Sequence, residues 1–377
     1  MNYTEKHTQL ASLFDSAKDE IIIPGSRVEI RNCYFKSDSV PDSIFSGDDR
    51  LISENRSFSY PVFIPPCRAS KKSILLLHGL NERSWVKYLA WAYFLCEVTG
   101  SYVVMFPISF HINRSPVAWR DPRAMMGSLN ARKKLGGEIS KASFANVALS
   151  NRLTDDPRRF IKSGYQTVED IICLISAIRS GKHPVVPASV NTDIFAYSIG
   201  AFLAEILMIS DPGGLFSGSK LFMFCGGSVF SNMNGESKLI MDKLAFEKVY
   251  SYYMDIFEKD IRERGSILNL LASGKVGLAF RSMIDYRRLR RSRETEFRRF
   301  GDRICTIAMM KDTVIPPAGI IETVSAGMKA PSKNIELWDF SFGYTHENPF
   351  PILTGPPADE VDRCFGRLIL KAGRFLL

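Results

Sequence analysis

Short, wholly apolar runs recur along the chain and predict buried strands. They are SILLL at 73–77, SYVVMFP at 101–107, DIFAY at 193–197, LFMFC at 221–225 and ICTIAMM at 304–310. A strand that is covered by helices on both faces is apolar at successive positions, whereas a strand with one solvated face alternates. These runs therefore predict the central strands of a sheet that is covered on both sides, with IELWDF at 335–340 as its last strand.

Stretches of helical periodicity lie between these runs. Apolar residues return every three or four positions over 86–98, 166–180 and 199–210, and a terminal helix is predicted over 358–377. The alternation of strand and helix is typical of parallel crossover units. The fold class that follows is α/β, a doubly wound and mostly parallel sheet.

The spacing of the elements predicts one core with inserted segments. RLISENRSFSYPVFIPP at 50–66 predicts an early strand, and 108–163 is loop-rich and is expected to form an insertion over the sheet. A short crossover would suffice between the strands at 221–225 and 304–310, yet a long and mostly helical stretch separates them. We therefore predict an N-terminal segment with early strands at 1–57, a core at 58–227 and 301–377, and a helical cap insertion at 228–300.

Composition narrows the class of protein. Of 377 residues, 45% are hydrophobic and 24% charged, as in ordinary globular proteins. The first twenty residues lack the apolar region of a secretory signal, and no run approaches the roughly 18 apolar residues of a membrane span, so we expect a cytoplasmic protein. The seven cysteines include no C-x-x-C pair, and neither a metal nor a cofactor is expected.

The motif Ala196-Tyr197-Ser198-Ile199-Gly200 lies between an apolar run and an amphipathic stretch. This is the strand–turn–helix context of the G-x-S-x-G nucleophile elbow, whose sharp turn requires small residues two positions before and after the serine. Alanine replaces the first glycine here, and we expect a narrower fit with the turn kept. The alternative is that Ser198 is only a helix N-cap.

Two further residues follow in the order nucleophile, acid, histidine. Asp312 directly follows the strand predicted at 304–310, and His346 lies between the last strand and the terminal helix. In open α/β sheets such strand ends form the site. Asp339 is the rival acid, but it lies within a predicted strand and would point less readily to the site. An exposed turn aspartate and a surface histidine are the alternatives.

These elements together resemble the α/β-hydrolase superfamily over 58–377. The segments YPVFIP, LLHGLNERSW, FPISFHINRSP and YTHENPF resemble an uncharacterised bacterial branch of it. The resemblance implies the α/β-hydrolase fold and a catalytic triad of Ser198, His346 and Asp312. It also implies an oxyanion hole formed by the backbone amides of Leu80 and Ile199.

The reaction implied is acyl transfer by a serine hydrolase of the esterase or lipase kind, on a small-molecule carboxylic ester or related acyl compound. His111 and Arg114 follow a predicted strand end and are candidate substrate-binding residues, although satisfaction of local carbonyls is the alternative. The acyl chain length and the oligomeric state are left open.

The positive charge suggests a second class of function. The net charge is +9, and 281–303 is dense in arginine. A solvated helix face explains such a stretch, but a non-catalytic module that binds an anionic partner through an arginine-rich cap is the alternative hypothesis. A third reading combines the two, with the cap selecting an acidic substrate or a peripheral anionic surface. Nucleic acid is not expected as a partner.

Overall fold

The strands form one mixed sheet that is mostly parallel. The computed structural model describes residues 1–38, 40–41, 44–45, 47–134, 139–188, 191–263, 268–269, 274–327 and 334–377. Within them the sheet order is β1-β2-β3-β5-β4-β6-β7-β8-β9. The first three strands run antiparallel to their neighbours, and those from β5 to β9 pair in parallel. The bounds are β1 Glu20–Ile22, β2 Glu29–Lys36, β3 Ser57–Ile64, β4 Lys72–Leu77, β5 Tyr102–Met105, β6 Asn191–Tyr197, β7 Leu221–Phe224, β8 Ile304–Met309 and β9 Ile335–Trp338.

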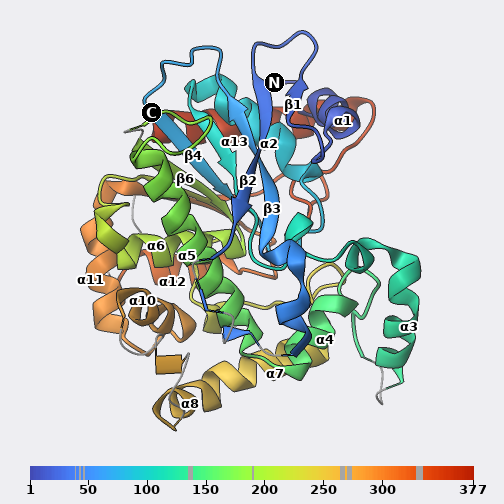
Figure 1. Ribbon diagram of the computed structural model, residues 1–377, viewed down its shortest axis with the longest axis vertical. Helices are drawn as coiled ribbons and strands as arrows, with labels where there is room; N and C mark the ends of the chain where they lie inside the picture. The colour runs from blue at the N-terminus through green and yellow to red at the C-terminus, as the bar shows by residue number, and fades with distance from the viewer. Residues whose placement is uncertain are drawn as a thin grey trace.

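Helices cover both faces of this sheet, as the uninterrupted apolar runs predict. Within β4, Ile74 and Leu76 pack toward one face, while Leu75 and Leu77 pack toward the other. The first face carries α1 Tyr3–Leu13, α2 Val86–Thr99 and α13 Pro356–Leu376. The second carries α5 Arg159–Arg179, α6 Ile199–Ser210, α10 Lys275–Ile284, α11 Arg290–Phe300 and α12 Pro317–Val324. Figure 1 shows the two groups on either side of the strands. The doubly wound α/β-hydrolase fold is thereby confirmed.

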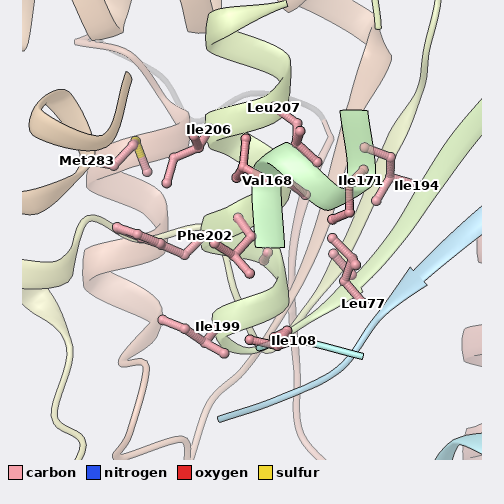
Figure 2. Close-up of a cluster of buried hydrophobic side chains, with 14 of the residues drawn as sticks. Leu77, Ile108, Val168, Ile171, Ile194, Ile199, Phe202, Ile206, Leu207 and Met283 are labelled. Atoms are coloured by element: carbon pink, nitrogen blue, oxygen red, sulfur yellow. The ribbon is translucent and has the colours of Figure 1, made fainter. Parts of the chain in front are cut away.

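Helix α6 lies at the centre of the second layer. Nearly all of its residues are buried, so its sequence shows apolar side chains on every face. Figure 2 shows the side chains that surround it, which come from α5, β4, β6 and α10. They include Val168, Ile171, Leu77, Ile194 and Met283. The helix that begins directly after Ser198 is therefore fixed on all sides.

The two inserted segments meet in one layer. The segment 108–163 contributes α3 Pro122–Lys133 and α4 Val147–Asp155, and the cap region contributes α7 Lys243–Ser251, a π-helical turn Tyr252–Ile256 and α8 Phe257–Glu263. Helix α4 packs on α7, and the two are neighbours in Figure 1. The Arg132 guanidinium donates to both carboxylate oxygens of Asp242, and both side chains are buried. This ion pair joins α3 to the N-terminus of α7.

The N-terminal segment is part of the same body. Strand β2 pairs along its whole length with β3, and α1 packs on α2 and α13, where the Tyr3 ring stacks on Phe365 at 4.1 Å between centroids. Helix α5 begins at Arg159, earlier than the predicted start at 166, because Phe160 and Ile161 continue its apolar stripe. Within the described residues, no helix is both long and apolar enough to span a membrane.

Candidate active site

Ser198 occupies a strained turn between β6 and α6. Its φ is 58° and its ψ is −126°, a region that residues other than glycine rarely adopt and that costs about 1–3 kcal/mol. Two backbone hydrogen bonds hold the turn: the Ser198 amide donates to Phe224 at 3.2 Å, and the Ala201 amide donates to Ser198 at 2.9 Å. The serine therefore has the backbone of a nucleophile elbow and not that of an ordinary N-cap, and its side chain makes no capping hydrogen bond.

Close backbone contacts explain the small residues around the turn. A Cβ atom on Gly200 would lie 2.6 Å from the Leu77 carbonyl oxygen, and one on Gly226 would lie 2.5 Å from the Cβ of Ala201. Neither position has room for a side chain. Ala196, which replaces the first glycine of the usual motif, is completely buried in the apolar core on the α6 side. The turn accommodates its methyl group.

The structure brings Ser198, His346 and Asp312 together in one hydrogen-bonded chain. Ser198 Oγ lies 2.7 Å from His346 Nε2, and His346 Nδ1 lies 2.7 Å from Asp312 Oδ2. The three residues are 4–5% exposed. Because a carboxylate only accepts, Nδ1 carries the proton and Nε2 accepts from the serine hydroxyl. Asp339, the rival acid, accepts instead from Tyr344 and pairs with Lys311.

The elements around the chain fix each of its members. The other carboxylate oxygen of Asp312 accepts from the amides of Val314 and Ile315, both at 2.9 Å, in the turn after β8. The Tyr197 hydroxyl donates to the His346 carbonyl, and its ring stacks on the imidazole with 5.6 Å between centroids. The sequence analysis missed Tyr197. Tyr197 occupies the variable position of the elbow. The alternation of side chains along the strand, which turns Tyr197 to the face opposite Ala196, could have predicted its position.

Leu80, in the loop after β4, lines the same cleft as Ser198. Neither the Leu80 nor the Ile199 amide donates to another described residue. His78 fixes the loop: its Nε2 accepts from the Ile108 amide at 2.9 Å, so its Nδ1 donates to the Gly79 carbonyl at 2.8 Å. Burial, followed by the nearby His111, holds the pKa of His78 well below its usual range, and the ring stays neutral.

Two hollows are lined by Ser198 itself, and a third is lined by its neighbour Ile199. A polar cleft of about 170 Å³ contains Ser198, His346, Arg83 and Lys87 among its lining residues. A first apolar hollow of about 30 Å³ reaches from Ser198 and Ile199 to Phe230 and Met241. A second, also about 30 Å³, is lined by Leu80, Ile199, Phe202 and His111. A polar space and an apolar space thus both adjoin Ser198.

His111 lines the second apolar hollow. Its Nδ1 donates to the Ser109 carbonyl at 2.9 Å, while its Nε2 is buried and has no hydrogen-bond partner among the described residues. Burial lowers the pKa of His111 to about 4, so the ring is neutral at physiological pH and Nε2 is a bare acceptor. A substrate-binding role for His111 stays a prediction.

Arg114 lies away from all three hollows. Its side chain is completely buried and pairs with Asp170 at 2.8 Å. It also donates to the Asn55 side chain and backbone and to the Pro107 carbonyl, and it lies over the Phe58 ring. The expected substrate contact is therefore corrected. The donors of this guanidinium are used by Asp170 of α5 and by the segments that precede that helix, so Arg114 has a structural role.

Replacing Arg114 with methionine tests this scaffold role. The variant is expected to lose about 3–5 kcal/mol of unfolding free energy, because it leaves the Asp170 carboxylate buried without its cation. Chemical denaturation measures the loss, and the double variant Arg114→Met/Asp170→Leu should recover part of it. An Arg114→Met protein of unchanged stability but weakened substrate binding would instead support the predicted substrate-binding role of Arg114.

Most arginines of the stretch 281–303 are engaged by neighbouring carboxylates or backbone carbonyls. Arg281 pairs with Glu258 at 2.7 Å, Arg290 with Glu294 at 2.7 Å and Arg299 with Glu296 at 2.7 Å. Arg293 is buried and donates to backbone carbonyls, among them that of Tyr286 at 2.6 Å. The stretch therefore resembles a solvated, internally paired helix surface more than a field of free cations.

Comparison with known proteins places the chain in a family. The model of a family described as "Family of unknown function (DUF6051)" matches residues 42–377. The chain belongs to the DUF6051 family. No curated protein matches this DUF6051 chain.

Several solved structures resemble the DUF6051 chain at low identity. Carboxyl esterase 2 of the mycorrhizal fungus Tuber melanosporum is 9% identical, with 100% of this chain and 99% of that chain covered and a TM-score of 0.46. An esterase of Pyrobaculum calidifontis is 9% identical, with 99% and 90% covered and a TM-score of 0.44. A serine hydrolase of Cycloclasticus zankles is 12% identical, with 92% and 98% covered and a TM-score of 0.42.

Among the residues that the structure describes, no group of three or more histidine, cysteine, aspartate or glutamate side chains is arranged to hold a metal ion.

Proposed function

We propose that this protein is a serine hydrolase that cleaves a carboxylic ester or related acyl compound. The observation that supports this most strongly is the hydrogen-bonded chain from Ser198 through His346 to Asp312, with 2.7 Å at each step. A serine hydroxyl becomes a nucleophile when an adjacent base removes its proton and a third group orients that base. The arrangement meets both conditions.

The reaction has two halves. In the first, His346 Nε2 takes the Ser198 proton as Oγ attacks the substrate carbonyl, and the amides of Leu80 and Ile199 bind the oxyanion. His346 then gives the proton to the leaving group, and the acyl group stays on Ser198. In the second half, water repeats the attack with the same base, and the carboxylic acid leaves.

Asp312 stabilises the imidazolium that forms in each half. One of its oxygens is occupied by two backbone amides, which leaves the other facing His346 Nδ1. The carboxylate therefore cannot rotate away from the ring as charge develops. It also selects the tautomer in which Nε2 is free to accept the serine proton.

Labelling with a fluorophosphonate probe tests the proposal. The probe phosphonylates activated serines with loss of fluoride, and we expect a single adduct on Ser198, located by peptide mass spectrometry, together with hydrolysis of short-chain nitrophenyl esters. Ser84→Ala is the matched control and should label normally, because Ser84 lines the same cleft but its hydroxyl has no hydrogen bond to a base among the described residues. Absence of both labelling and ester turnover in folded protein would refute the proposal for these substrates.

A further inference from the structure

The polar cleft lies on the side of Ser198 from which a leaving group would depart. In acyl transfer the base that deprotonates the serine also protonates the leaving group, so the leaving group must lie against His346. His346 lines the polar cleft but neither apolar hollow. Under the proposed function, on which this inference rests, the leaving group occupies the polar cleft and the acyl group occupies the apolar side.

The charges in that cleft are unevenly satisfied. Lys87 pairs with Glu82 and also donates to the Glu347 carbonyl at 3.0 Å. Glu82 accepts a second hydrogen bond from Tyr88 at 2.7 Å. The Glu347 carboxylate accepts from the Ser237 hydroxyl. Both carboxylates and the lysine are thus engaged by the protein itself.

Arg83 is the exception among these charged groups. It is half-buried in the wall of the cleft, and it makes no ion pair and no side-chain hydrogen bond to any other described residue. A guanidinium presents five N–H donors in a planar fork that matches a carboxylate or a phosphate. The two cations and two carboxylates that line the cleft balance in number, but Arg83 alone among these four has its donors unused by the described residues.

The backbone around Arg83 is firmly held, so its side chain has a defined reach. Its neighbour Glu82 accepts through its backbone carbonyl from the Ile112 amide at 3.0 Å, and Trp85 is buried. The Asn81 side chain donates to the Ala145 and Leu239 carbonyls at 2.8 and 2.7 Å. Arg83 follows Leu80 by three residues, which limits the separation of their backbones to about 10 Å.

The apolar hollow beside Ser198 is small. The first hollow is about 30 Å³ and is lined largely by apolar side chains such as Phe230, Met233 and Val314. A space of this size suits an acyl group of a few carbons. The two sides therefore differ in polarity and in volume, with about 170 Å³ available on the leaving-group side.

We infer that Arg83 is a specificity-determining residue, and that the substrate is an ester of a short apolar acid with an alcohol that carries a carboxylate or a phosphate. Arg83 binds that anion through charge-assisted hydrogen bonds and orients the leaving oxygen toward His346. It touches the substrate away from the reacting bond, so its loss should impair anionic substrates selectively.

Two esters that share an acyl group test the inference. Acetyl esters of 4-hydroxybenzoate and of methyl 4-hydroxybenzoate differ mainly in the negative charge of the leaving group. For each enzyme the ratio of kcat/KM values, anionic over neutral, cancels effects common to both esters. Arg83→Gln should lower this ratio about tenfold, as expected for one lost charge-assisted contact. Arg83→Glu should lower it further, and Arg83→Lys should retain part of it.

Arg291→Gln is the matched control, since it removes one exposed cation on α11 away from the cleft and should leave the ratio unchanged. A phosphate-bearing aryl acetate, run in parallel, shows which anion is preferred. An unchanged ratio in Arg83→Gln, with the neutral ester still hydrolysed, would overturn the role of Arg83 and leave the serine hydrolase intact. Failure of wild type on every ester and with the fluorophosphonate would instead refute the proposed function.

Discussion

Replacing Ser198 with alanine is expected to lower kcat for ester hydrolysis by on the order of a millionfold, to the residual rate supplied by binding and the oxyanion hole. Under the proposed function, the variant loses the hydroxyl that forms the acyl-enzyme. Its fold should persist, because alanine keeps the Cβ that already occupies the strained turn at φ 58°. Steady-state kinetics on a nitrophenyl ester measures the loss, and circular dichroism checks the fold.

The members of a triad act as a unit, which provides an internal control. Ser198→Ala/His346→Ala should be no slower than Ser198→Ala alone, since the base has no proton to take once the hydroxyl is gone. Asp312→Asn should cost less, about 10⁴-fold, because the serine and the base remain while the tautomer changes. Full activity in Ser198→Ala would show that another nucleophile carries the reaction.

Acidification is expected to destabilise the protein between about pH 6.5 and pH 4. Burial lowers the pKa of both His111 and His183 from 6.5 to about 4. His183 Nδ1 accepts from the Val186 amide at 2.8 Å, and Nε2 donates to the Tyr60 hydroxyl at 2.9 Å, so the folded state binds the neutral ring.

The direction of the effect follows from which state binds the proton. Above pH 6.5 these rings are neutral in both states, and the full stability is present. As the pH falls from 6.5 to 4, these histidines bind protons in the unfolded chain but not in the folded chain. The unfolding free energy should therefore drop by about 3 kcal/mol for each of the two histidines. The lowered pKa of buried His78 acts in the same direction.

Glu205 acts in the opposite direction. Its carboxylate is buried, and burial raises its pKa well above 4.5, so the folded state holds a proton that the unfolded chain releases above pH 4.5. The Glu205→Gln substitution removes this opposing contribution. Urea denaturation between pH 7.5 and 4.5 should therefore show a steeper loss of unfolding free energy for this variant than for wild type. A Glu205→Gln protein whose stability is constant over that range would contradict the neutral, buried state of the histidines.

Local sequence patterns determined much of the fold. The apolar runs at 73–77 and 304–310 became β4 and β8, and the helix after Ser198 begins where predicted. A strand buried on both faces has few alternatives to an uninterrupted apolar run, so its position is encoded locally. The first strands were harder to predict, because β1 has only three residues and β2 is positioned in the sheet mainly by its pairing with β3.

For the site, the sequence alone determined that Ser198, Asp312 and His346 follow strand ends in the order of an acyl-transfer triad, because strand ends and small residues at a tight turn are local features. Only the tertiary structure decided that Arg114 is buried against Asp170, that Tyr197 holds the His346 loop and that Arg83 has no partner among the described residues. Those outcomes depend on residues that are distant in sequence. Whether a charged side chain is paired or free is set by what the fold packs against it, which no local pattern records.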